Sequence, residues 1–291
     1  MLLSNETLAW HTSFRIGGVA DHYARVSDMN HLAQAMFFAA DRDLPVFVLG
    51  AGSNILVSDS GIRGLVIENR MQSVSIDCQG RLRANSGVPM ASLVRLAARH
   101  GLSGLEWAAG LPGTLGGAIV SNAGAFGHSI GDVLSWAGVL SPDCTEVILT
   151  GSEMGFGYRT SYFKRSGTRT EQEIILEAEL ALRPAARETI EADLKECITQ
   201  RRKTQPTGSG AGSIFKNPPG DYAGRLIEAV GLKGYRVGGA QISPKHANFM
   251  INLGDATAAD VSNLIETARM RVIDQFGIWL DLEIEMVGEW E

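Results

Sequence analysis

The chain has 291 residues, of which 45% are hydrophobic and 20% are charged, and this composition excludes a disordered or fibrous protein. A chain of this length buries a sizeable core and is expected to form about two domains. The net charge of −6 argues against general nucleic-acid binding, because phosphate contacts require a basic surface, and it leaves room only for local basic pockets.

The cysteines and the distribution of apolar residues indicate the cellular compartment of the protein. The three cysteines, Cys78, Cys144 and Cys197, are far apart and odd in number, which is typical of a protein of the reducing cytoplasm. The first residues lack the basic and apolar regions of a signal peptide, and no run of about twenty apolar residues follows. We therefore expect a cytoplasmic protein without a membrane segment. The six histidines form no HExxH or comparable cluster, so we expect no metal.

The first part of the chain alternates helix and strand patterns. Residues 28–43 carry apolar residues at helical spacing behind Asp28, which is a suitable N-cap. The apolar run 45–50 predicts a strand, and residues 65–68 predict another beyond a glycine-containing loop.

Residues 71–183 are rich in strand patterns. One helix is expected at 90–101, and the sequence "SPDC" (141–144) predicts a hairpin turn between two strands. The expected strands are 73–77, 82–87, 135–141, 145–150 and 173–182.

The remaining residues mix helices and strands again. Helices are expected at about 186–203, 221–231 and 256–277, and strands at 247–252 and 279–289. The last strand alternates apolar residues with Asp281, Glu283 and Glu285, which on their own would be assigned to its solvated face. The fold class expected from these patterns is α+β.

Gly50, Ala51 and Gly52 follow a strand and invite a dinucleotide-binding interpretation. A Rossmann loop must open a helix, whereas Ser53 and Asn54 lead into the β-type run "ILV". Two alternatives remain: a tight turn between strands, or a turn whose backbone N–H groups bind an anion.

A second stretch, "GLPGTLGGA" (110–118), is predicted to be too glycine-rich for a helix interior and too apolar for a disordered linker. It continues to Gly124 with Thr114 and Asn122 as hydrogen-bonding side chains. A packed crossover is one explanation. Two glycine loops in the first half of the chain modestly favour the other, a single extended phosphate-bearing cofactor.

Two polar segments are candidates for a reaction centre. Arg159 lies between tyrosines in "GYRTSYFK", where its guanidinium either binds a carboxylate or phosphate or stacks on the rings at the surface. Ser213, Lys216 and Asn217 lie in "GSIFKNP", which is a polar cluster or a loop that caps the next helix. The context "AGSIF" is not the G-x-S-x-G elbow of a hydrolase.

These segments, in this order, resemble the bacterial UDP-N-acetylenolpyruvoylglucosamine reductases. The resemblance covers nearly the whole chain, and the segments that carry it are "TSFRIGG", "VLGAGSNILVSD", "GLEWAAGLPGTLGGAIVSNAGAFG", "GYRTSYFK", "AGSIFKNP", "GLKGYRVGGAQISPKHANFMIN" and "LEIEMVGE". It implies two FAD-binding subdomains of the vanillyl-alcohol-oxidase type, at residues 1–70 and 71–185, followed by an α+β substrate-binding domain at 186–291.

The resemblance also implies a reaction and its residues. NADPH reduces FAD, which reduces the enolpyruvyl ether of a UDP-sugar to give UDP-N-acetylmuramate for peptidoglycan, with Arg159, Ser213 and Glu283 as catalytic residues. The implied FAD contacts are Gly50, Ala51, Gly52, Ser53, Asn54, Gly113, Thr114, Gly117, Asn122 and Gly124. The implied substrate contacts are Tyr158, Lys216, Asn217, Lys233 and His246. A monomer with small-molecule partners alone is expected.

Departures and rival functions stay open at this stage. The short span from Arg159 to Ser213 resembles the shorter branch of the family, so another segment must close over the substrate. Glu285 stands where the family commonly has a basic residue, and the lead-in to Ser213 is unusually glycine-rich. The rivals are a flavin oxidase of the same fold acting on an alcohol or sugar, and a sugar-nucleotide-binding protein without a catalytic role.

Overall fold

A computed structural model describes residues 2–165 and 173–290, which form two compact units. The first unit comprises Ala24–Ala51 and Ile67–Arg201, and the second comprises Leu2–Tyr23, Gly52–Val66 and the residues from Arg202 onward. Strands β2 (Val19–Val26) and β5 (Ile62–Asn69) continue from one unit into the other. The division into three domains at residues 70 and 185 stays a prediction.

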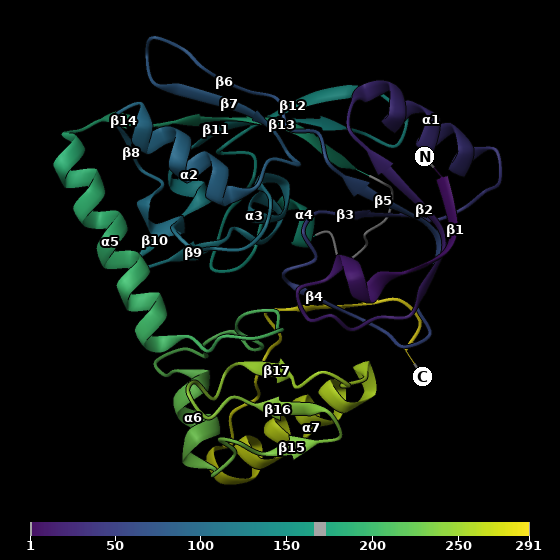
Figure 1. The fold of residues 1–291 in the computed structure, drawn as a ribbon, viewed down its shortest axis with the longest axis vertical. Coiled ribbons are helices and arrows are strands. Elements are labelled where there is room, and N and C mark those ends of the chain that lie inside the picture. The colour runs from purple at the N-terminus through teal and green to yellow at the C-terminus, as the bar shows by residue number, and fades with distance from the viewer. Residues whose placement is uncertain (1, 166–172, 291) are drawn as a thin grey trace. The chain divides into compact units, whose positions relative to one another are not determined.

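The largest sheet of the first unit is antiparallel and has five strands. Figure 1 labels each of them. Its order is β12 (Glu146–Thr150), β11 (Leu134–Leu140), β13 (Ile174–Ala181), β7 (Arg81–Asn85) and β6 (Val74–Ile76). The predicted hairpin is confirmed, because Ser141 N donates to Thr145 O at 2.9 Å between β11 and β12. The apolar faces of this sheet and of helix α2 (Met90–Arg99) share one buried core.

Most helices of the first unit follow the sequence pattern. Helix α1 (Met29–Ala40) begins after Asp28, whose carboxylate accepts from His31 N at 2.9 Å, and α5 (Arg187–Thr204) covers the predicted charged helix. The shorter elements are β3 (Val46–Leu49), β8 (Leu102–Ser103), β9 (Gly124–Ala125), β10 (His128–Ser129), α4 (Tyr162–Arg165), β14 (Arg183–Pro184) and the 3-10 helices Glu106–Ala108 and Ile130–Asp132.

Helix α3 (Leu115–Ser121) corrects one prediction, because it lies inside the stretch judged too glycine-rich for a helix. The helix contacts β7 and β13, and a Cβ atom on Gly116 would come within 2.9 Å of Ser86 Cβ. Close packing therefore requires glycine at that position, which outweighs its low helix propensity.

The second unit contains a three-stranded antiparallel sheet packed on a helix. Its order is β15 (Arg236–Val237), β16 (Ala240–Ile242) and β17 (Met250–Asn252), and α7 (Ala258–Phe276) contacts β15, β16 and helix α6 (Ala223–Ala229). Thr257 and Asp260 form a capping box at the start of α7. The Asp59 carboxylate also accepts from Ala258 N and Ala259 N, at 2.8 and 3.0 Å. Strand β1 (Leu2–Thr7) and the 3-10 helix Leu8–His11 also belong to this unit.

The final strand is shorter than predicted. Only β18 (Glu285–Val287) is regular, and it pairs in parallel with β4 (Ile55–Val57). Leu282, three residues earlier, instead forms an antiparallel bridge with Phe215. The predicted strand over 279–289 is wrong because the chain changes its pairing partner, and Glu283 lies at the bend between the two pairings.

No helix in the described part of the chain is long and apolar enough to cross a membrane.

Candidate active site

The two glycine-rich stretches meet within the first unit. A Cβ atom on Gly50 would lie 2.6 Å from Oγ1 of Thr114, so this approach requires a glycine. Thr114 is buried and accepts from Gly117 N at 3.4 Å as the N-cap of α3. The structure thus brings Gly50 and Thr114 together, as a shared cofactor site would require, and FAD contact by these residues stays a prediction.

The loop after Gly50 leads directly into strand β4, so the prediction that it opens no Rossmann helix is confirmed. Gly52 has φ +58°, and a Cβ atom there would lie 2.3 Å from His11 O. Its carbonyl accepts from Ser13 N at 3.0 Å. Gly52, His11 and Ser13 all belong to the second unit, so these contacts fix Gly52 within that unit.

Arg159 occupies a tight turn of the first unit. Gly157 N donates to Thr160 O at 3.1 Å, and Thr160 N donates to Gly157 O at 3.2 Å, with Tyr158 and Arg159 between them. Arg159 has φ +53°, which lies in the left-handed region that non-glycine residues avoid. Its guanidinium lies 6.0 Å from the ring of Tyr158, which is itself mostly exposed. A strained arginine fixed in a turn is a functional candidate.

Asn122 holds the Arg159 turn in place. This residue ends α3 in the left-handed conformation and is buried, and its Nδ2 donates to Gly157 O at 2.8 Å. Its Oδ1 accepts from Gly131 N at 3.1 Å. Both ends of the amide therefore bind backbone, so the structure gives Asn122 a positioning role, while its predicted FAD contact stays a prediction. Gly124 lies nearby in β9, where a Cβ atom would come within 2.5 Å of His128 O.

Ser213 and Glu283 belong to the second unit, and main-chain pairing places their segments side by side. Ser213 forms an antiparallel bridge with Phe249, and the next residue, Ile214, accepts from Glu283 N at 2.8 Å. Lys216 N donates to Asp281 O at 2.8 Å. The proton-donor candidate and the carboxylate candidate are thus carried by neighbouring, hydrogen-bonded segments.

Asn248 is a site residue that sequence reasoning missed. It is 3% exposed, its Oδ1 accepts from Phe215 N at 2.9 Å, and its Nδ2 donates to Phe215 O at 2.8 Å. The Asn248 side chain thus satisfies both the backbone N–H and the backbone C=O of Phe215, which lies two residues after Ser213. The available signal was an asparagine between the apolar residues of "HANFM", where a polar side chain needs a buried partner.

Asn54 connects the predicted cofactor loop to Glu283. Its Nδ2 donates to Glu283 O at 3.1 Å, and its carbonyl accepts from Glu285 N at 3.0 Å. The last residue of the predicted cofactor loop is therefore hydrogen-bonded to the Glu283 segment, and both lie in the second unit.

The second unit contains the expected substrate contacts Asn217, Lys233 and His246. Asn217 Oδ1 accepts from Ala223 N at 3.1 Å, so Asn217 caps helix α6, as one of the two interpretations of its loop required. Burial, and then the charge of Lys233, lowers the pKa of His246. Because Nδ1 of His246 accepts from Asn248 N at 3.2 Å, the hydrogen of the neutral ring is on Nε2. Lys233 also pairs with Glu228 at 2.8 Å.

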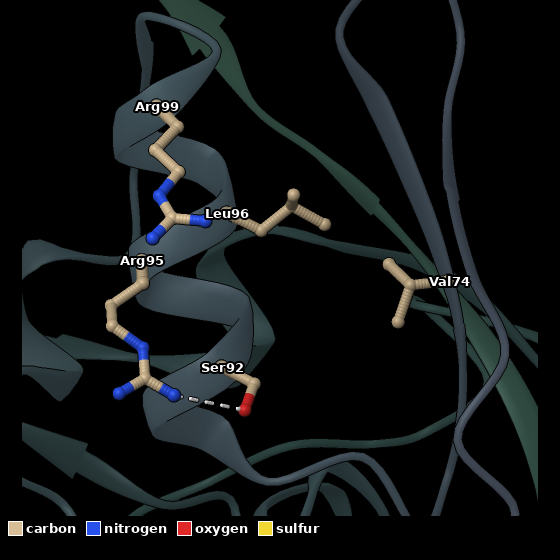
Figure 2. Close-up of a pocket in the computed structure, with 5 residues that line it drawn as sticks. All are labelled: Val74, Ser92, Arg95, Leu96 and Arg99. Atoms are coloured by element: carbon tan, nitrogen blue, oxygen red, sulfur yellow. Dashed lines mark hydrogen bonds between the residues drawn. The ribbon is translucent and has the colours of Figure 1, made fainter.

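A groove on the first unit is lined by a different set of residues. Val74, Ser92, Arg95, Leu96 and Arg99 line it between α2 and β6, and Arg95 donates to Ser92 Oγ at 3.4 Å (Figure 2). None of the residues expected to bind cofactor or substrate lines this groove. Within residues 2–165 and 173–290, no three histidine, cysteine or acidic side chains are grouped as metal ligands.

Comparison with known proteins decides the family. Residues 205–287 match the family described as UDP-N-acetylenolpyruvoylglucosamine reductase, C-terminal domain, and residues 20–150 match an FAD binding domain. The reductase of Moorella thermoacetica is 47% identical over 99% of this chain and 94% of its own length. A reductase of Symbiobacterium thermophilum is 45% identical over 97% of this chain and 91% of its own.

The chain belongs to the UDP-N-acetylenolpyruvoylglucosamine reductase family. The crystal structure of the reductase from Thermus caldophilus agrees, with a TM-score of 0.82, 36% identity and coverage of 98% of both chains. The resemblance inferred from sequence motifs and the α+β fold class are therefore confirmed. The first unit fits a bound FAD, because the bare backbone of Gly50 meets Thr114 within the residues that match the FAD binding domain.

Proposed function

We propose that this chain reduces UDP-N-acetylglucosamine-enolpyruvate to UDP-N-acetylmuramate with NADPH, through bound FAD, in peptidoglycan precursor synthesis. The observation that carries the proposal is the pairing of the Ser213 segment with the Glu283 backbone in a chain that is 47% identical to a named reductase. NADPH and a UDP-sugar are cytoplasmic metabolites, so the proposed enzyme works in the cytoplasm. Its monomeric state stays a prediction.

Arg159 is proposed to bind the carboxylate of the enolpyruvyl group. When bound, FAD supplies the hydride chemistry, taking a hydride from a nicotinamide and releasing one to carbon. A hydride added to the terminal carbon would place negative charge on the neighbouring carbon and, by delocalisation, on the carboxylate bonded to it. The turn holds the Arg159 backbone at φ +53°, so the residue is in place before that charge grows, and preorganised groups of this kind contribute roughly 10²–10³ in rate.

Ser213 is proposed to deliver the proton that completes the reduction. Its hydroxyl is a weak acid, so nearby positive charge, for which Lys216 is the candidate, must stabilise the oxygen as its proton leaves. Glu283 is proposed to interact with the carboxyl of the intermediate, and the hydrogen bond from Glu283 N to Ile214 O supports a fixed relation between the two segments.

Binding of the UDP-sugar is assigned to Tyr158, Lys216, Asn217, Lys233 and His246. The cations and the amide suit a diphosphate and a pyrimidine. A neutral His246 with its hydrogen on Nε2 provides a donor without a second positive charge beside Lys233.

Purified protein tests the proposal directly. FAD released on denaturation is measured first, and NADPH oxidation is then followed with and without the enolpyruvyl substrate under anaerobic conditions. We expect one UDP-N-acetylmuramate per NADPH consumed. A colourless protein without FAD, or NADPH oxidation that follows O₂ and ignores the substrate, contradicts the proposal.

Substitution of Ser213 separates the two half-reactions. Ser213→Ala should leave flavin reduction by NADPH near the wild-type rate while flavin reoxidation by substrate slows by roughly 10² or more. Ser60→Ala, at an exposed position of the same unit, is the matched control and should change neither rate. Equal losses in both half-reactions would mark Ser213 as structural.

A further inference from the structure

Arg201 is a buried arginine without an anionic partner. It lies near the end of α5 in the first unit and is 8% exposed. Nη2 donates to Trp107 O at 3.0 Å, whereas Nε is buried and has no hydrogen-bond partner within residues 2–165 and 173–290. In the same part of the chain Arg201 forms no ion pair. The Nε–H of its guanidinium is therefore a buried donor without a protein acceptor in those residues.

A cation in this position is costly to the folded protein. Removing a charge from water without a counter-charge is strongly unfavourable, so buried arginines are normally paired. Burial lowers the pKa of Arg201, and the charge of Arg159 lowers it further, against an opposing effect of Cys197. Two arginines of one unit thus act unfavourably on each other, which a single anion would relieve.

The surroundings of Arg201 are built around its side chain. A Cβ atom on Gly110, where φ is +76°, would lie 3.3 Å from Arg201 Cδ, so glycine leaves room for the arginine stem. The guanidinium lies 5.3 Å from the ring of Phe126, and Phe126 has φ +54°, which is unfavourable for a bulky residue. Strain retained at such a position indicates a functional constraint.

These neighbours connect Arg201 to the cofactor-binding part of the chain. Trp107, Gly110 and Phe126 all lie within residues 20–150, which match the FAD binding domain. Arg201 itself lies outside that range and outside residues 205–287, so neither family match includes it.

We propose that Arg201 is an anion-binding residue of the FAD site, whose unpartnered Nε–H donates to a negatively charged oxygen of bound FAD. This inference rests on the proposed function for the presence of FAD. The oxygen belongs either to the diphosphate or to the ring system that gains negative charge on reduction, and either can accept a charge-assisted hydrogen bond from the guanidinium.

The test compares Arg201→Met with Arg202→Met, the same change at the next, exposed position of α5. FAD is removed, the apoprotein is titrated with FAD by fluorescence quenching, and thermal unfolding is recorded for both forms. Loss of a charge-assisted hydrogen bond should raise the Kd for FAD about 10- to 100-fold in Arg201→Met, with Arg202→Met at the wild-type value. Arg201→Lys keeps the charge without the planar fork, so we expect a smaller rise in the same direction.

The outcomes separate the sources of the anion and the competing explanations. A raised Kd with an unchanged flavin midpoint potential assigns the diphosphate, and a lowered midpoint potential assigns the reduced ring. An unchanged Kd in Arg201→Met overturns the inference, whether the apoprotein is destabilised or only the KM for NADPH or substrate rises. If Arg201→Met does not fold, Arg201→Lys decides by the same criterion. A wild-type protein that binds no FAD refutes the proposed function instead.

Discussion

Asn248→Ala should destabilise the protein and impair one half-reaction selectively. The substitution leaves the N–H and C=O of Phe215, a fully buried residue, without partners. Each buried group left unsatisfied costs about 1–3 kcal/mol, so we expect a loss of roughly 2–5 kcal/mol in the free energy of unfolding. Asn248→Asp keeps the acceptor for Phe215 N but buries a carboxylate against the carbonyl of Phe215, so it should not restore the lost stability.

Urea unfolding and stopped-flow kinetics measure the two effects separately. Because Phe215 lies two residues after Ser213, the freed segment should slow flavin reoxidation by substrate while flavin reduction by NADPH stays near normal. Asn263→Ala, at an exposed position of α7, is the matched control and should be neutral or slightly stabilising. A loss below about 0.5 kcal/mol for Asn248→Ala, the range of ordinary surface changes, would refute the reasoning.

Three further predictions follow from single contacts. Asp59→Ala removes the carboxylate that accepts two amides at the start of α7 and should cost about 1 kcal/mol in urea unfolding, whereas an unchanged midpoint would contradict the capping role. The lowered pKa of His246 means that the unfolded chain binds its proton more readily, so stability should fall as the pH drops below 6.5; His246→Gln should flatten that slope, and an identical slope would contradict it. Asn54→Ala removes the bond to Glu283 O and should slow flavin reoxidation by substrate more than flavin reduction, and equal rates to wild type would count against it.

Local sequence patterns correctly predicted the elements whose boundaries are determined by adjacent residues. Asp28 caps α1 as expected, and the turn at 141–144 joins two antiparallel strands, because capping and turn chemistry depend on a few adjacent residues. The long helix α7 also lies within one turn of its predicted bounds. The family was recognisable because its motifs occur in order along nearly the whole chain.

Elements that depend on distant partners were not predictable from local sequence. Helix α3 contains Gly116 because Ser86, thirty residues earlier in the sequence, leaves no room for a side chain at that position. The alternating apolar pattern near the end predicted one long strand, yet the chain there pairs first with Phe215 and then with β4. Periodicity reports which side chains are buried, and it does not report where a strand changes its partner.

Three asparagines show how the candidate residues are positioned. Asn122 binds the carbonyl before the Arg159 turn, Asn248 binds the backbone next to Ser213, and Asn54 binds the carbonyl of Glu283.

In each case the contact is to main chain, so it does not depend on the side chain of the catalytic candidate. Replacing Ser213 should therefore remove the proton-donating hydroxyl and leave the backbone of its segment in place. Replacing an asparagine should instead shift the segment, so that the catalytic side chain is present but misplaced. Rescue distinguishes the two: a small acid added to Ser213→Gly can restore proton delivery, but it cannot restore Asn248→Ala, where the donor is already there.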